Sequence, residues 1–186
     1  MKIRIYTAAL ACALVAASCS TDGCLDNQSS IPLAGIYSSE TGAAISISGI
    51  QIMGVGAPND SLLVASGSVQ QVYLPMRSTT NTTEWCFHYT QPGIDDEAFN
   101  DYIRFTYTSE PYFASEECGA MYRYHITEVE YTTNLLESVE ITDSLITNTD
   151  VERIRLYFRT ATPPDPDEGE EETPDTGTET PDTEQQ

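Results

Sequence analysis

Basic residues are scarce in this chain. Its 186 residues include 29 Asp and Glu but only 8 Lys and Arg, which gives a formal net charge of −21. Lys2 is the single lysine. Nucleic acids and anionic lipid surfaces are bound by clustered cations, so this composition argues against a nucleic-acid partner and against electrostatic attachment to a membrane.

The residues and motifs of common enzymes are also scarce. The chain has 2 His. It contains no Cys-x-x-Cys, His-Glu-x-x-His, Gly-x-Ser-x-Gly or glycine-rich phosphate-binding loop. We therefore predict a protein that is not an enzyme and needs no cofactor.

The apolar run Ile5–Ala17 is shorter than the roughly 18 to 20 residues that a membrane-spanning helix needs. Lys2 and Arg4 precede this run, and small residues follow it up to Cys19. This pattern is typical of a secretory signal. Its end resembles a bacterial lipobox, in which Cys19 is lipidated and becomes the first residue of the mature protein. The alternative is an ordinary secreted protein with an incidental Cys.

Four regions follow from this interpretation. Residues 1–18 are a lipoprotein signal peptide, 19–30 a lipidated linker, 31–159 one folded domain and 160–186 a tail. Loss of the signal leaves six Arg against 29 carboxylates, a formal charge of −23. The acyl chains on Cys19 would then supply the membrane affinity.

The tail is rich in Pro, Thr, Asp and Glu, and it holds ten of the 29 carboxylates. It lacks residues that could fill a core, which predicts disorder. A solvated, solubilising tail is the simplest interpretation. Contact with the cell wall or a partner, and weak binding of divalent cations, are the alternatives.

Alternation of apolar and polar residues predicts strands throughout the domain. The clearest runs are Ile103–Tyr107, Tyr122–Ile126 and Ile154–Phe158. Turn residues separate these runs from further candidates, and one of the expected turns is Ser109–Pro111. Eight to ten short strands predict an all-β fold, an antiparallel β-sandwich, with a flattened barrel as the alternative. The further candidates are Leu33–Ser38, Ala44–Met53, Ser61–Ala65, Val69–Leu74, Glu84–Thr90 and Ser138–Ile146.

One candidate strand changes phase. Ile45 and Ile47 point to one side, whereas Ile50 and Ile52 fall in the opposite phase. A β-bulge at Gly49 would bring all four onto one face.

Several short segments follow one another along the chain in a characteristic order: Cys24, Gly49–Ile52, Asp60–Leu62, Leu74–Met76, Phe113–Gly119, Asn134–Ile141 and Glu152–Phe158. Their order resembles that of small uncharacterised lipoproteins of Bacteroidales, whose domain has no known function. The resemblance covers nearly all of the domain and implies an envelope lipoprotein. It brings no known active site or ligand.

Cysteine usage agrees with export. Cys19 would carry lipid, which leaves Cys24, Cys86 and Cys118 in a compartment where disulfides persist. Turn-like surroundings, together with Cys at both places in the resembling family, favour a disulfide between Cys24 and Cys118. Cys86 would then be a free thiol.

The aromatic segment 85–89 also contains Cys86 and His88, which project from the same face of a strand. The two could form a thiolate and imidazolium pair or half of a zinc site. A structural Cys beside a satisfied His is the simpler interpretation. If the aromatic residues fill the core, Cys86 and His88 face solvent or the rim of the partner sheet.

An acidic loop offers oxygen ligands of the kind that calcium prefers. It lacks the regular spacing and the glycine of an EF-hand loop, so a solvated acidic hairpin is the simpler interpretation. The residues are Asp95, Asp96, Glu97, Asn100 and Asp101.

Three of the arginines lie on one face of the last predicted strand: Arg153, Arg155 and Arg159. This stripe could protect an exposed sheet edge from pairing, could hold the acidic tail, or could bind an anionic sugar or lipid phosphate.

Together these features predict a lipid-anchored, non-enzymatic envelope protein that binds or helps assemble other components. A glycan- or calcium-binding β-sandwich module is the alternative. Its partners would be the membrane, through Cys19, and an envelope protein or glycan. Ser20–Gly23 lacks the acidic run with Lys that resembles a surface-export signal, which favours a position facing the periplasm, and we expect the anchor to lie in the outer membrane. Binding would need outward Tyr, Trp and Arg around a concavity, and assembly a flat apolar patch or an unpaired strand edge.

Overall fold

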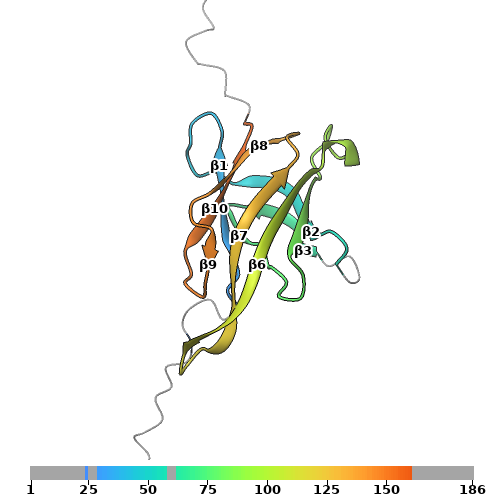
Figure 1. The fold of residues 1–186 in the computed structure, drawn as a ribbon. Helices are drawn as coiled ribbons and strands as arrows, with labels where there is room; N and C mark the ends of the chain where they lie inside the picture. Colours follow the sequence, from blue (N-terminus) through green and yellow to red (C-terminus); the bar gives the residue numbers. More distant parts are fainter. Residues whose placement is uncertain (1–23, 25–28, 58–61, 161–186) are drawn as a thin grey trace, which may run out of the picture.

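The computed structural model describes residues 24, 29–57 and 62–160 (Figure 1). The predicted signal peptide, Cys19 and all of the predicted tail except Thr160 lie outside these residues. The strands are β1 (Leu33–Ser38), β2 (Ile47–Gly54), β3 (Leu62–Val69), β4 (Gln71–Tyr73), β5 (Thr82–Tyr89), β6 (Asp101–Ser115), β7 (Gly119–Tyr131), β8 (Leu136–Ile141), β9 (Leu145–Ile146) and β10 (Glu152–Phe158), with a short 3-10 turn, η3 (Glu97–Phe99), before β6.

The strands form two sheets, which confirms the predicted all-β sandwich. One sheet has four strands in the order β4-β1-β10-β8, and the other has six in the order β3-β2-β5-β6-β7-β9. Neighbouring strands are antiparallel except β1 and β10, which pair in parallel. The first and last strands therefore lie side by side and close the domain.

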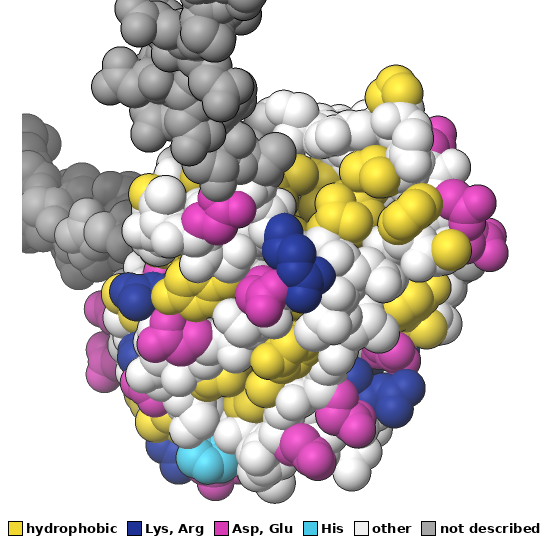
Figure 2. Space-filling view, turned by 90° about the horizontal axis from the view of Figure 1, so that it is seen from above, with side chains coloured by type: hydrophobic (Ala, Val, Ile, Leu, Met, Phe, Trp, Pro, Cys, Tyr) yellow, Lys and Arg dark blue, Asp and Glu magenta, His cyan; other side chains and the backbone are white. Residues whose placement is uncertain are grey.

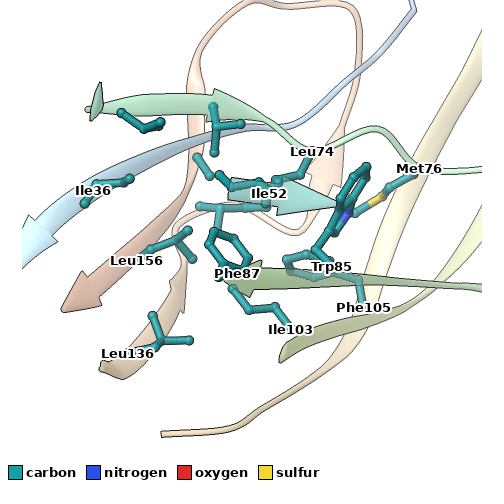
Figure 3. Close-up of a cluster of buried hydrophobic side chains, with 14 of the residues drawn as sticks. Ile36, Ile52, Leu74, Met76, Trp85, Phe87, Ile103, Phe105, Leu136 and Leu156 are labelled. Atoms are coloured by element: carbon teal, nitrogen blue, oxygen red, sulfur yellow. The ribbon is translucent and has the colours of Figure 1, made fainter. Parts of the chain in front are cut away.

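The core lies between the two sheets and follows the period-two pattern of the strands. In β10 every second side chain, from Ile154 to Phe158, is buried. Each large apolar side chain buried in this way stabilises the fold by roughly 1.5 to 3 kcal/mol. In Figure 3 the two sheets direct side chains toward one another: Ile36, Leu136 and Leu156 from the four-stranded sheet, and Ile52, Phe87, Ile103 and Phe105 from the six-stranded sheet.

The predicted bulge at Gly49 is confirmed. The β2–β3 register shifts between Ser48 and Ile50, and Gly49 has a φ of 64°, in the left-handed region that favours glycine. Ile50 is completely buried, and Ile47, on the other side of the bulge, also packs against the core. The extra residue brings both halves of β2 onto the core face.

Two sequence interpretations were wrong. A turn was expected at Ser109–Pro111, but β6 continues through Pro111. Proline has no backbone N–H to donate to a neighbouring strand. This lack costs nothing here, because β5 pairs with β6 only up to Thr106 and leaves that side of Pro111 unpaired. A single strand was expected over Ser138–Ile146. The Asp143 side chain instead accepts a hydrogen bond from the backbone N–H of Leu145 at 2.9 Å, and this turn separates β8 from β9, which belong to different sheets.

The long β6–β7 hairpin projects beyond the other strands at one end of the molecule (Figure 1). The last described residue, Thr160, lies at the opposite end, where its hydroxyl is 2.9 Å from that of Ser38. Within the described ranges, no helix is long and apolar enough to cross a membrane.

Candidate functional site

The acidic loop does not gather its oxygens around one point. Asp96 caps the 3-10 turn by accepting a 2.8 Å hydrogen bond from the backbone N–H of Ala98. Asp95 lies beside His88, with Oδ1 3.3 Å from Nε2. Asp101 is completely buried and accepts hydrogen bonds from neighbouring strands and loops. In the part of the chain that the structure describes, no three His, Cys, Asp or Glu side chains are placed to hold a metal ion.

Cys86 and His88 line a pocket of about 470 Å³ on the outer face of the six-stranded sheet, with Asn100 and Tyr102 among the other lining residues. Of the two surroundings expected for Cys86, solvent and the rim of the partner sheet, exposure to solvent was wrong, because its side chain is buried in this wall at 5% exposure. Burial raises the pKa of the Cys86 thiol, and a hydrogen bond with Tyr102 only partly opposes this effect. A raised thiol pKa disfavours the thiolate that nucleophilic catalysis or zinc binding needs.

His88 is oriented by its neighbours rather than by Cys86. Its Nδ1 lies 2.8 Å from Oδ1 of Asn100. Its Nε2 faces the carboxylate of Asp95. Both ring nitrogens therefore have partners from the acidic loop, and the His fastens this loop to β5.

The arginine stripe lies on the outer face of the four-stranded sheet, and each of its members has an acidic partner. Arg153 contacts Asp143, and Nε of Arg155 lies 3.1 Å from Glu152. Arg159 pairs with Glu137 and donates to the backbone oxygen of Thr133. Figure 2, which views the uppermost end in Figure 1, likewise shows basic side chains next to acidic ones.

The edge-protection interpretation of Arg153, Arg155 and Arg159 was wrong. β10 lies between β1 and β8, so it is an inner strand. Because the acidic partners already neutralise the guanidinium groups, the stripe also offers little to an anionic ligand. The interpretation that involves the tail concerns residues outside the described ranges.

Tyrosines accompany this stripe. Tyr37 donates to Glu152 at 2.7 Å, and the guanidinium of Arg155 lies 5.5 Å from the centre of the Tyr37 ring. Tyr157 donates to Glu140 at 2.8 Å. The hydrogen bond to Glu152 raises the pKa of Tyr37. These aromatic and charged groups bind one another through hydrogen bonds and a cation–π contact, so their interactions lie mainly within the four-stranded sheet.

The predicted disulfide is present. Cys24 and Cys118 are bridged with their Cα atoms 4.7 Å apart, and Cys118 lies in the turn of the β6–β7 hairpin. Cys86 is a free thiol, as expected. The bridge ties the chain before β1 to the projecting end of the hairpin.

Among the strands at the sheet edges, β3 is long and uncharged, whereas the others are short or charged. Four strands lie at the edges of the two sheets: β4 and β9 have three and two residues, and β8 carries Glu137 and Glu140. Short length and charge both hinder pairing with another chain. β3 has eight residues and no charge, and six of these residues are exposed. Register shifts with β2 bend the strand, but within the described part of the chain its outer side has no neighbouring strand.

The uncharged region extends beyond β3. Between Glu40 and Glu84 the sequence contains only Asp60 and Arg77 as charged residues. In a chain with a formal charge of −21 this stretch is neutral. The lack of charge around β3 is therefore visible in the sequence, although no local pattern shows that β3 lies at a sheet edge.

An apolar pocket adjoins the start of β3. It has a volume of about 230 Å³, and Leu62, Leu63, Pro75 and Trp85 are among the residues that line it. Leu62 is 47% exposed. The buried indole N–H of Trp85 has no hydrogen-bond partner among the described residues. The edge and the pocket together make the strongest candidate for a site of protein contact.

Comparison with known proteins places the chain in a family. A model described as a family of unknown function, DUF6452, matches residues 49–158, from the bulge in β2 to the end of β10. No curated protein and no solved structure matches the chain. The family match spans more than half of the 186 residues, and the chain belongs to the family of unknown function DUF6452.

Proposed function

We propose that this protein is a lipid-anchored, non-enzymatic component of the cell envelope that assembles with another envelope protein through β3. The observation that carries the assembly role is the uncharged, unpaired edge of β3. The lipid anchor rests on the sequence of residues 1–19 and on the resemblance to small Bacteroidales lipoproteins. The missing surface-export signal at Ser20–Gly23 supports a position facing the periplasm, and we propose the outer membrane as its location.

The partner at this edge is an extended, uncharged segment of a different protein. A strand added to a sheet edge gains main-chain hydrogen bonds, and side-chain pockets give specificity. Leu62 and Leu63 border an apolar pocket that would accept a side chain of the added strand. A second copy of this chain is disfavoured, because two molecules that each carry −23 after loss of the signal repel one another.

The anchor is tested separately from the assembly role. Cys19→Ser should release a folded domain from the membrane fraction, and mass spectrometry of the wild-type amino-terminal peptide should find acyl chains on Cys19. A Cys19→Ser variant that stayed in the membrane fraction would contradict the anchor.

The assembly role is tested with a photocrosslinking amino acid at Ser66, an exposed position of β3. We expect one crosslinked partner, a protein other than this chain. With the crosslinker kept at position 66, Ala65→Lys at the neighbouring exposed position of β3 should weaken its recovery at least tenfold. Thr108→Lys is the matched control, because it adds the same charge at an exposed position of β6. Reproducible recovery of the protein alone, or only of a homodimer, would overturn the proposal.

A further inference from the structure

The projecting end of the β6–β7 hairpin exposes an apolar face. Pro111 pairs with Tyr122 and Phe113 pairs with Ala120 across the hairpin, so these four side chains share one side. All four are exposed. Phe113 is 67% exposed, more than any other large apolar side chain in the described residues.

This face continues the core-facing side of the hairpin past the end of the sandwich. Ser109 pairs with Tyr124, which is buried on the same side. The opposite side of the hairpin end already has partners. Tyr112 donates to Asn148 at 2.9 Å, and Arg123 pairs with Glu110. The Phe113 side is therefore the one that the described residues leave uncovered.

The disulfide holds Cys24, which follows the proposed lipid site, next to this end of the hairpin. Cys118 is in the hairpin turn and is bridged to Cys24. Cys19 precedes Cys24 by five residues, which span at most about 18 Å when fully extended. A lipid on Cys19 would thus hold the hairpin end close to the bilayer surface, whereas η3 lies at the opposite end of the molecule (Figure 1).

We infer that the face formed by Pro111, Phe113, Ala120 and Tyr122 inserts into the interface of the membrane that holds the anchor. The inference rests on the proposed lipid anchor and adds a second contact, which fixes the orientation of the domain. Aromatic side chains are favoured at the headgroup level of a bilayer. Glu116 and Glu117 are exposed in the same turn, so the face suits zwitterionic rather than anionic phospholipid.

Tryptophan placed at Phe113 reports on this contact. The chain from Cys19 to Gln186 is coupled through Cys19 to a maleimide-headgroup lipid in phosphatidylcholine vesicles. Cys24 and Cys118 are bridged and Cys86 is buried, so Cys19 is the accessible thiol. We expect the emission of Phe113→Trp to shift to the blue by roughly 10 nm on coupling and to be quenched by brominated acyl chains, because an interfacial indole leaves water.

Phe99→Trp is the matched control, since Phe99 is 40% exposed in η3 at the far end. Its emission should not change on coupling, and Trp85 contributes the same background to both variants. Unchanged emission of Phe113→Trp would overturn the inference. So would a blue shift that lipid bromine does not quench, because a second copy would then cover the face. Chemical coupling keeps this test valid even if Cys19 proves to be unlipidated in cells.

Discussion

The hydroxyl of Tyr89 donates a 2.8 Å hydrogen bond to the carboxylate of Asp101, and both residues are completely buried. The same carboxylate also accepts hydrogen bonds from the Thr132 hydroxyl and from the backbone N–H groups of Asn134, Leu135 and Leu136. These donors compensate a buried charge that has no cationic partner among the described residues, and they fasten the β7–β8 connection to the start of β6.

Asp101→Asn should therefore destabilise the domain strongly. The amide would direct N–H groups at backbone N–H donors, and we expect the free energy of unfolding to fall by roughly 2 to 4 kcal/mol. Urea denaturation measures this change. Asp95→Asn is the control, because the Asp95 side chain is 60% exposed, and it should change stability by less than about 0.5 kcal/mol. Equal stability of the two variants would contradict the structural role of Asp101.

Alkaline pH should weaken the Tyr89 contact. Burial, with the nearby negative charge of Asp101, raises the pKa of Tyr89 well above its usual value. The folded state then holds this proton more tightly than the unfolded state. The resulting stability is complete below the unfolded tyrosine pKa of about 10 and is lost as the pH rises above it.

Comparison with Tyr89→Phe isolates this effect from the other tyrosines. At pH 7 the variant should be less stable by about 1 to 2 kcal/mol. Denaturation between pH 8 and pH 11.5 should show the difference shrinking above about pH 10. A difference that stayed constant over this range would show that Tyr89 does not titrate on unfolding.

Reduction of the disulfide should lower stability substantially. Cys24 and Cys118 are 94 positions apart, and closing so long a loop stabilises a protein by roughly 3 to 5 kcal/mol in the chain-entropy model. The double variant Cys24→Ser, Cys118→Ser should show this loss in urea and should not respond to reductant. Cys86→Ala serves as the control that keeps the bridge and remains sensitive to reductant. If reductant left the urea denaturation midpoint of the wild-type protein unchanged, the prediction would be refuted.

Gly35 makes room for the carboxylate of Glu152 on the outer face of the four-stranded sheet. A Cβ on Gly35 would overlap this carboxylate and lie 2.8 Å from the Tyr37 ring. We expect Gly35→Ala to cost about 1 to 3 kcal/mol of stability.

Glu152→Ala should relieve part of this cost, so the two changes should be non-additive in a double-mutant cycle. Gly67→Ala is the matched control, because a Cβ there meets no atom within 4 Å. Additive losses from Gly35→Ala and Glu152→Ala would place the strain elsewhere.

Several features of the fold could be predicted from local pattern. Alternation along segments such as Ile154–Phe158 is set by the two-residue repeat of a strand, and it identified the buried side chains. The phase change between Ile47 and Ile50 located the bulge, because a single extra residue reverses which face a side chain occupies.

Other features depend on which strands become neighbours. Pro111 looked like a turn residue, but it is tolerated in β6 because none of the described strands pairs with the β5 side of β6 at this position. The arginines of β10 looked suited to an edge, but β1 and β8 enclose that strand. Cys86 was expected to face solvent or the rim of the partner sheet, yet the wall of a pocket buries it.

The sequence by itself determined the all-β class, the buried side of each clear strand and the neutral stretch between Glu40 and Glu84. Each depends on residue type and spacing along the chain. Only the tertiary structure decided that β3 is an edge, that the arginine stripe is enclosed by acids, and that the exposed Phe113 lies at the end of the molecule tied to Cys24. Strand order is set by contacts between residues far apart in sequence, and local periodicity does not specify which strands meet.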